Sequence, residues 1–265
     1  MVSIEHAFLP EYIGLRQPFK AITQFILAKF IRAFYNKCDL IIIPAQTAIK
    51  EMRERGISSR IVAIPLGIDI KKYKPARNKK LKELAKRRLG IDGIVIGYYG
   101  RIAREKSLTT LIAAFSRLRK KYRNALHLLI VSPSTMLKLP KLPGMKRIII
   151  KYKGKMPNVV PYLQAMDLYV LPSVTETVSI SSIEAMACGV PVVSTAAGWM
   201  SELINKNNGL IFEKRNVNEL TQKLEKLIKN KKIRYKLGKK ARKTIVRGYN
   251  LNNMIKKLEK VIDKV

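Results

Sequence analysis

Two glutamates in the stretch from Asp167 to Ser194 have the residue type and spacing to do chemistry. Glu176 falls in a loop, and Glu184 follows after seven intervening residues, early in an expected helix. A carboxylate accepts strong charge-assisted hydrogen bonds from hydroxyl groups, and a helix N-terminus favours a phosphate. Sugar hydroxyls and phosphate in one crevice indicate a sugar nucleotide. The alternative is that Glu184 is an ordinary helix acid and Glu176 a solvated loop charge.

The elements around these glutamates are predicted to be a strand, a loop, a helix and a second strand. An apolar run covers 168–171, hydroxyl residues from Ser179 onwards cap a helix that ends at Gly189, and a second apolar run covers 190–193. This is the repeating unit of a parallel α/β sheet, in which ligands bind at the carboxyl ends of the strands. Both glutamates fall at that end, so we expect them to face one crevice.

A second group of candidate residues follows another apolar strand, which begins at Ile94. Gly100 and Arg101 come directly after this strand, and Lys106 follows five residues after the arginine. Two cations and a helix N-terminus at the carboxyl end of a strand make a diphosphate site. The alternative is that Glu105 and Lys106 form a solvated pair with no ligand.

Taken together, these motifs resemble the retaining glycosyltransferases of the GT-B fold, glycosyltransferase family 4, also called glycosyl transferases group 1. The resemblance covers nearly the whole chain. Its motifs, in order, are the join Ile64-Pro65-Leu66-Gly67-Ile68-Asp69, the Gly-Arg-x4-Lys pattern from Gly100 to Lys106 with Ser107 in place of the usual glycine, the Glu176-x7-Glu184 signature followed by AMACGVPVV, and the glycine loop from Ala196 to Ile204.

The resemblance implies an α/β fold of GT-B type, with one complete and one partial Rossmann-like domain. The expected parts are a partial N-terminal, acceptor-side domain over 1–75, a basic linker over 76–90, a C-terminal nucleotide-sugar-binding domain over 91–248 and a crossover helix over 249–265. On this alignment the first part of the N-terminal domain is absent from the chain.

The resemblance also implies a role for each site residue. Arg101 and Lys106 would stabilise the departing diphosphate, Glu176 would hold the donor sugar, and Glu184 would hold the ribose. His6 lies where such enzymes keep a catalytic histidine near the donor sugar, although a polar residue near a chain end is an equally favoured interpretation. The expected catalytic residues are thus His6, Arg101, Lys106 and Glu176, and the expected donor-binding residues are Gly100, Arg101, Lys106, Glu176, Thr177, Val178, Ser179, Ile180 and Glu184.

The reaction implied is transfer of a hexose from a UDP- or GDP-linked sugar to a glycan or lipid-linked acceptor, with retention of configuration. The resemblance implies no metal and no cofactor beyond the donor substrate. One alternative is a non-catalytic donor-binding half that depends on a partner subunit for the missing strands. Another is nucleic-acid binding, which rests on charge alone, because no zinc-finger, RNP or helix-turn-helix pattern is present.

Charge is the outlier in the composition. Lys and Arg number 53 against 18 acids, a net charge of +35, so the surface should attract phosphate, anionic lipid headgroups or nucleic acid. Residues 71–90 hold ten basic residues and one acid, which predicts a solvated linker and helix or a strip facing lipid or phosphate. The apolar residues of a predicted helix from Phe19 to Lys37 are expected to pack on their own sheet, and its basic residues are a candidate contact for anionic lipid.

The composition and the lack of targeting patterns also indicate a cellular compartment. Hydrophobic residues make up 47% of the chain, enough for a sizeable core. Cys38 and Cys188 are isolated, which predicts no disulfide and no metal site and favours a reducing compartment. No signal peptide pattern and no apolar run of membrane-spanning length are seen. We therefore expect a cytoplasmic protein, with peripheral attachment to the inner membrane face as an addition.

Overall fold

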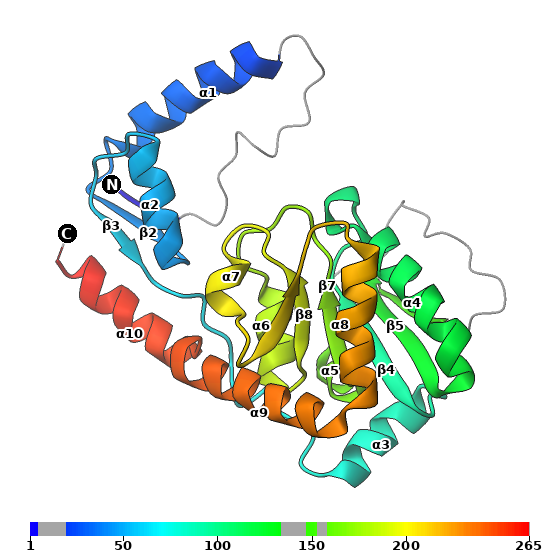
Figure 1. Cartoon of the computed structure of the whole chain (residues 1–265). Helices are drawn as coiled ribbons and strands as arrows, with labels where there is room; N and C mark the ends of the chain where they lie inside the picture. Colours follow the sequence, from blue (N-terminus) through cyan, green and yellow to red (C-terminus); the bar gives the residue numbers. More distant parts are fainter. Residues whose placement is uncertain (5–19, 134–146, 153–157, 265) are drawn as a thin grey trace. The chain divides into compact units, whose positions relative to one another are not determined.

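The computed structural model describes residues 1–4, 20–133, 147–152 and 158–264 (Figure 1). The chain divides into two units. The first comprises Met1–Gly67 with Asn252–Val265, and the second comprises Ile68–Leu251. Each unit has its own parallel sheet, which confirms the α/β class expected from the strand and helix pattern.

The first unit holds a three-stranded parallel sheet in the order β1-β2-β3. The central strand is an unbroken apolar run with every side chain buried, as expected for a strand covered on both faces. From the last helix, Met254, Leu258 and Val261 pack against a cluster that includes Leu40 and Ile42, so this helix returns to the N-terminal strands as predicted. The elements are β1 Val2–Ile4, α1 Lys20–Tyr35, β2 Leu40–Ile43, α2 Gln46–Glu54, β3 Ile61–Ala63 and α10 Leu251–Ile262.

Helix α1 departs from expectation. Its apolar residues were expected to pack against their own sheet, but Phe25, Ile26 and Phe30 are exposed, so the prediction is wrong for them. The helix turns only a narrow stripe inward, in which Tyr35 is buried and Ile31 is partly buried. The exposed apolar side chains Phe25, Ile26, Phe30 and Phe34 lie outside this stripe, where one sheet cannot cover them.

The second unit holds a six-stranded parallel sheet in the order β6-β5-β4-β7-β8-β9. The order of connection reverses between β4 and β7, which is the topological switch point where ligands bind in open α/β sheets. The strands are β4 Ile94–Tyr99, β5 Leu126–Pro133, β6 Arg147–Tyr152, β7 Leu168–Leu171, β8 Val192–Thr195 and β9 Gly209–Phe212. β9 was not predicted from the sequence, because its four residues begin with a glycine, which is typical of a turn.

Helices of the second unit pack in pairs, α4 with α8, α6 with α9, and α3 with α5 (Figure 1). The helix α3 begins at a capping residue, because the Asn78 side chain accepts a hydrogen bond from its first turn. The helix α4 has an apolar face, on which Leu111, Phe115 and Leu118 are buried. The helices are α3 Lys79–Arg88, α4 Leu108–Tyr122, α5 Val160–Ala165, α6 Ile180–Ala187, α7 Met200–Leu203, α8 Val217–Lys229 and α9 Lys231–Gly248, with the 3-10 turns η2 Arg104–Lys106 and η3 Arg123–Ala125.

An internal ionic clamp fixes α3 to the two central strands. Asp167, at the start of β7, lies 2.9 Å from Lys82 Nζ and 2.7 Å from Lys86 Nζ, and it accepts a hydrogen bond from the backbone of Val95 in β4. Burial alone would raise the pKa of Asp167, but the two lysines outweigh it and hold the pKa below its ordinary value. Of the basic stretch 71–90, Lys86 is therefore part of the interior, and Lys82, whose side chain is 31% exposed, is paired with the same carboxylate.

Candidate functional site

Three loops meet where β4, β7 and β8 end, at the carboxyl edge of the larger sheet. The Thr195 hydroxyl, from β8, donates to the carbonyl of Ser173 after β7 at 2.6 Å. The backbone N–H of Val174 donates to the carbonyl of Glu105, in the loop after β4, at 2.7 Å. These bonds hold the segments that carry the predicted site residues against one another.

Lys106 and Glu176 are in contact at this edge. Lys106 Nζ lies 2.6 Å from Glu176 Oε2, and only 16% and 11% of the two side chains are exposed. The hydroxyl of Ser173 also donates to Glu176, at 3.3 Å. The structure thus joins two of the predicted catalytic residues from loops 70 positions apart. A solvated pair of Glu105 with Lys106, the alternative for this motif, is not formed.

Ser107 occupies the position where the resembled motif has glycine. Its backbone is left-handed, with φ 45° and ψ 42°, a conformation that favours glycine. The Ser107 hydroxyl lies 2.9 Å from the hydroxyl of Thr110, which gives the side chain a local partner. With serine at position 107 the backbone still adopts this left-handed turn, and Lys106, the residue before it, contacts Glu176.

Arg101 remains exposed in the loop after β4. Its guanidinium lies 3.4 Å from Glu105 Oε1, a surface contact that contributes little and leaves the cation accessible. The backbone around it is fixed, because the carbonyl of Arg101 accepts a 2.6 Å hydrogen bond from the Tyr98 hydroxyl. Gly100, before it, donates its N–H to the carbonyl of Val131 in β5 at 3.0 Å.

Glu184 is buried one turn into α6. Burial raises the pKa of this carboxyl, while a hydrogen bond with Tyr73 and the positive charge of Lys72 oppose the rise. The helix begins as the sequence predicts, since the Ser179 side chain accepts a hydrogen bond from the N–H of Ser182 at 3.2 Å. The second carboxylate of the signature is therefore a shielded group held by its own hydrogen-bond donor.

A buried tyrosine on β7, Tyr169, is hydrogen-bonded near both signature motifs, and its pKa responds to the charge of both glutamates. The Tyr169 hydroxyl lies 2.9 Å from the carbonyl of Tyr99 and 2.7 Å from the hydroxyl of Ser181, and so links the end of β4 to α6. Burial raises the pKa of Tyr169, the hydrogen bond with Ser181 opposes this, and the charges of Glu176 and Glu184 add to it. The Tyr169 hydroxyl thus lies within the electrostatic influence of both glutamates.

The backbone of Glu176 and Thr177 packs closely against Gly198. The carbonyl of Thr177 accepts from the N–H of Trp199 at 3.1 Å, and a Cβ at Gly198 would lie 1.7 Å from the carbonyl oxygen of Glu176. Gly198 also has a left-handed backbone, with φ 55°. Only glycine permits this approach, so the glycine loop found in the sequence serves to position Glu176.

The other predicted donor-binding residues differ in their surroundings. Val178 is buried, Ile180 is exposed, and the Ser179 side chain is used to cap α6. The N–H of Ser179 points to Met200 Sδ at 3.4 Å, a weak acceptor. His6 lies outside the described residues, so the structure neither places it at the site nor separates it from the site.

The described ranges hold no candidate metal site and no candidate membrane-spanning helix. No group of three or more His, Cys, Asp or Glu in these ranges could hold a metal ion. No helix in the part of the chain that the structure describes is both long and apolar enough to cross a bilayer. Cys38 and Cys188 are both buried free thiols, and burial raises the pKa of Cys188 to about 12, which keeps it protonated and unreactive.

Sequence patterns missed three residues of the site. Tyr73 contacts Glu184 from a stretch whose basic composition indicated a solvated linker and helix or a strip facing lipid or phosphate, and not a partner of Glu184. Ser173 supports Glu176, and its position directly after an apolar strand was the available signal. Tyr169 lies within an apolar strand, where a tyrosine is ordinarily a core residue, so no signal marked it.

The fold and this site define the class of the protein. The structure superposes on sucrose-phosphate synthase from Thermosynechococcus elongatus with a TM-score of 0.81 and 20% identity. The superposition covers 99% of this chain and 67% of the synthase chain. It superposes on the Anabaena protein HepE in complex with UDP and glucose over 100% and 71% of the chains, with a TM-score of 0.81 and 18% identity. These likenesses show the GT-B fold.

The chain belongs to the family described as Glycosyl transferases group 1, which matches residues 80–244. It is 30% identical over 202 residues to the capsular polysaccharide biosynthesis glycosyltransferase CapM of Staphylococcus aureus, covering 73% of this chain and 51% of CapM. It is 26% identical over 255 residues to a Campylobacter jejuni N,N'-diacetylbacillosaminyl-diphospho-undecaprenol α-1,3-N-acetylgalactosaminyltransferase, covering 94% and 67%. The chain thus spans about half to two thirds of the length of these relatives.

Proposed function

We propose that the chain binds a UDP- or GDP-linked hexose and transfers the hexose to an acceptor with retention of configuration, as in glycosyltransferase family 4. The observation that carries this proposal is the 2.6 Å contact of Lys106 with Glu176 at the carboxyl edge of the larger sheet. A cation there suits a diphosphate, and a carboxylate beside it suits the hydroxyls of the attached sugar.

In this proposal the chemical step is the departure of the nucleoside diphosphate from the sugar. Negative charge grows on the leaving diphosphate as the glycosidic bond breaks, and fixed cations that meet this charge lower the barrier. Lys106 and Arg101 fill that role. When the diphosphate binds Lys106, Glu176 is released from its counterion and accepts hydrogen bonds from the sugar. Glu184, held by Tyr73, accepts from the ribose.

Names of relatives support the donor and the acceptor class. HepE was solved with UDP and glucose, and the Campylobacter relative is named for a diphospho-undecaprenol acceptor. An Acholeplasma laidlawii relative, 28% identical over 224 residues, is named alpha-monoglucosyldiacylglycerol synthase. We therefore propose a lipid-linked acceptor, with a soluble glycan as the competitor in assays.

The first test is a thermal-stability screen with UDP- and GDP-linked hexoses. A donor present at 100 times its Kd stabilises the folded state by about 2.7 kcal/mol, which raises Tm by several degrees. The donor with the largest shift is then assayed for transfer to short-chain lipid-linked and soluble glycan acceptors. Absence of a Tm rise with every nucleotide sugar would contradict the proposal.

A second candidate function is a donor-binding half that needs a partner for transfer. Donor binding without transfer by the chain alone, with transfer restored by a partner subunit, would support it. Transfer by the chain alone would exclude strict dependence on a partner.

A further inference from the structure

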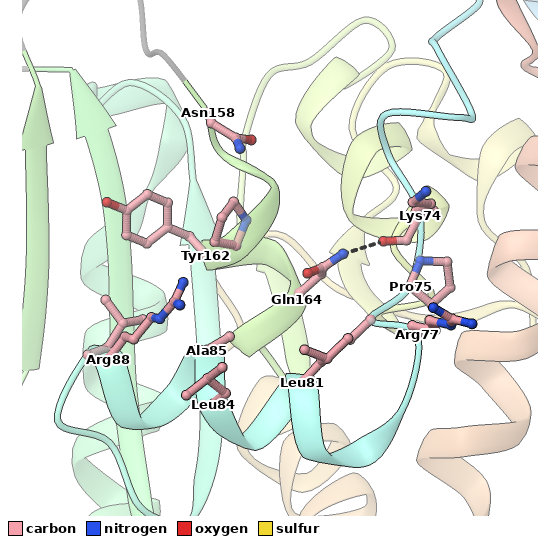
Figure 2. Close-up of a pocket in the computed structure, with 13 residues that line it drawn as sticks. Lys74, Pro75, Arg77, Leu81, Leu84, Ala85, Arg88, Asn158, Tyr162 and Gln164 are labelled. Carbon is pink, nitrogen blue, oxygen red and sulfur yellow. Dashed lines mark hydrogen bonds between the residues drawn. The ribbon is translucent and has the colours of Figure 1, made fainter.

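A groove lies between α3 and α5, formed by residues outside the donor site (Figure 2). We call it the α3–α5 groove. Its volume is about 900 Å³, within the range of pockets that hold one drug-sized molecule. None of the residues predicted to bind the donor lines it. The groove therefore needs an explanation separate from sugar transfer.

The floor of the groove is apolar and open to solvent. Leu81 and Leu84 of α3 are 45% and 42% exposed, and Pro161 and Tyr162 of α5 also line the groove. Figure 2 shows the two leucines and Ala85 on the side of α3 that lines the groove. Leucines this exposed within a hollow are typical of a surface that contacts an apolar group.

Cations stand at the two ends of this floor. Arg88 lies at one end and Arg77 and Lys74 lie at the other (Figure 2). Within the described ranges no carboxylate is in ion-pair contact with these three side chains, whereas Lys82 and Lys86 on the same helix are both bound to Asp167. The charges that face the interior are thus compensated, and those around the groove are left for an external anion.

We propose that the α3–α5 groove docks the chain on an anionic phospholipid surface. Lys74, Arg77 and Arg88 would contact lipid phosphates, and Leu81 and Leu84 would contact the glycerol backbone and the first acyl carbons. Basic residues around exposed leucines are the composition by which proteins bind anionic membrane interfaces. A free phosphate or a nucleic acid would use the cations but gain nothing from the leucines, so the two features together favour a phospholipid.

Vesicle co-sedimentation of the full chain tests this proposal, and the test does not depend on sugar transfer. Vesicles of phosphatidylglycerol and phosphatidylcholine are compared with phosphatidylcholine alone at physiological salt. We expect binding only to the anionic vesicles. The double variant Arg77→Glu/Arg88→Glu should bind at least tenfold more weakly, and Leu81→Ser/Leu84→Ser several-fold more weakly.

The matched control is Lys120→Glu/Lys226→Glu. These lysines are exposed on α4 and α8, which contribute no residue to the groove, and the substitution changes net charge by the same amount. We expect its binding to fall less than threefold. An equal loss in the control and in the groove variants would overturn the proposal, because binding would then follow net charge alone.

Further arms separate the other anions. Inorganic phosphate at millimolar concentration should not release the chain from vesicles, and a short RNA should bind the Leu81→Ser/Leu84→Ser variant as well as the wild type. Release by phosphate, absence of binding to anionic vesicles, or vesicle binding unaffected by the leucine substitutions would each overturn the proposal. Cooperative thermal unfolding followed by circular dichroism verifies that each variant is folded, and Arg77→Gln/Arg88→Gln replaces the charge reversal if that variant is not.

Discussion

At the scale of single residues, the ion pair of Lys106 with Glu176 sets a requirement for any ligand at the site. Such a ligand has to give each of the two charges a new partner. Their side chains are almost fully shielded and in direct contact, with Ser173 as a further donor to the carboxylate. In the proposed function, the diphosphate of the donor would compete with Glu176 for Lys106. Because a buried charge without a partner is costly, the exchange favours a ligand that supplies an anion for the lysine and hydroxyls for the carboxylate together. A nucleoside diphosphate sugar supplies both.

Glu184 gives a prediction about pH at the same scale. Burial raises its pKa above the ordinary value of 4.5, so the charged carboxylate destabilises the fold at neutral pH. This penalty is fully present above the folded-state pKa and disappears below pH 4.5. We expect Glu184→Gln, which keeps an acceptor for Tyr73, to raise Tm at pH 7 and to weaken donor binding. The gain should shrink as pH falls towards 4. Melting curves across this range measure it, and a lower Tm at pH 7 would contradict the account.

At the scale of elements, the Asp167 clamp on α3 is expected to be a main source of stability. Asp167→Asn leaves Lys86, whose side chain is 6% exposed, without its counterion. We expect a loss of about 3 kcal/mol in the free energy of unfolding at pH 7. The pKa of Asp167 is held below 3.8, so the clamp stabilises the fold above that pH and is lost as pH falls through the lowered pKa.

Urea unfolding at pH 7 and near pH 3 measures this clamp. The difference between the wild type and Asp167→Asn should be largest at pH 7 and smaller in acid. A variant as stable as the wild type at neutral pH would show that α3 is held by its apolar contacts alone.

Gly198 tests the loop that positions Glu176. Gly198→Ala places a Cβ 1.7 Å from the Glu176 carbonyl at a left-handed backbone position, so the loop must move. We expect a lower Tm and weaker donor binding. Gly248→Ala is the matched control, because a Cβ there meets no atom within 4 Å and alanine favours the helix, by about 0.5–1 kcal/mol. Equal effects of the two substitutions would refute the role given to Gly198.

The elements also show what the sequence could predict. The strand 168–171 was predicted with the bounds observed, because it has an uninterrupted apolar pattern. Strand β9 was missed, since four residues beginning with glycine resemble the end of a turn. The outward apolar residues of α1 were misassigned because burial depends on the partner sheet, which local periodicity does not specify.

The site was predictable to the extent that its residues lie in compact motifs. Residue type and spacing predicted Lys106, Glu176 and Glu184 as site residues. The structure shows a 2.6 Å contact between Lys106 and Glu176. The partners Tyr73 and Tyr169 could not be found in this way. Tyr73 reaches Glu184 from a segment 111 positions away in the sequence. That contact is a tertiary one, and no local pattern encodes it.

At the scale of the whole molecule, the division into two units gives a prediction about autonomy. The described site residues all lie within Ile68–Leu251. We expect a fragment of residues 68–251 to unfold cooperatively and to bind donor with a Kd within about fivefold of the full chain. A fragment without a cooperative transition would contradict this.

The most direct test of the account is calorimetric titration of the full chain with the nucleotide sugar that gives the largest thermal shift. Arg101→Ala and Lys106→Ala should each raise the Kd at least tenfold, because each removes a cation from the diphosphate. Arg104→Ala, which removes an exposed cation from the same turn, should change it less than twofold. An unchanged Kd in both Arg101→Ala and Lys106→Ala would show that the donor diphosphate does not bind at this edge of the sheet.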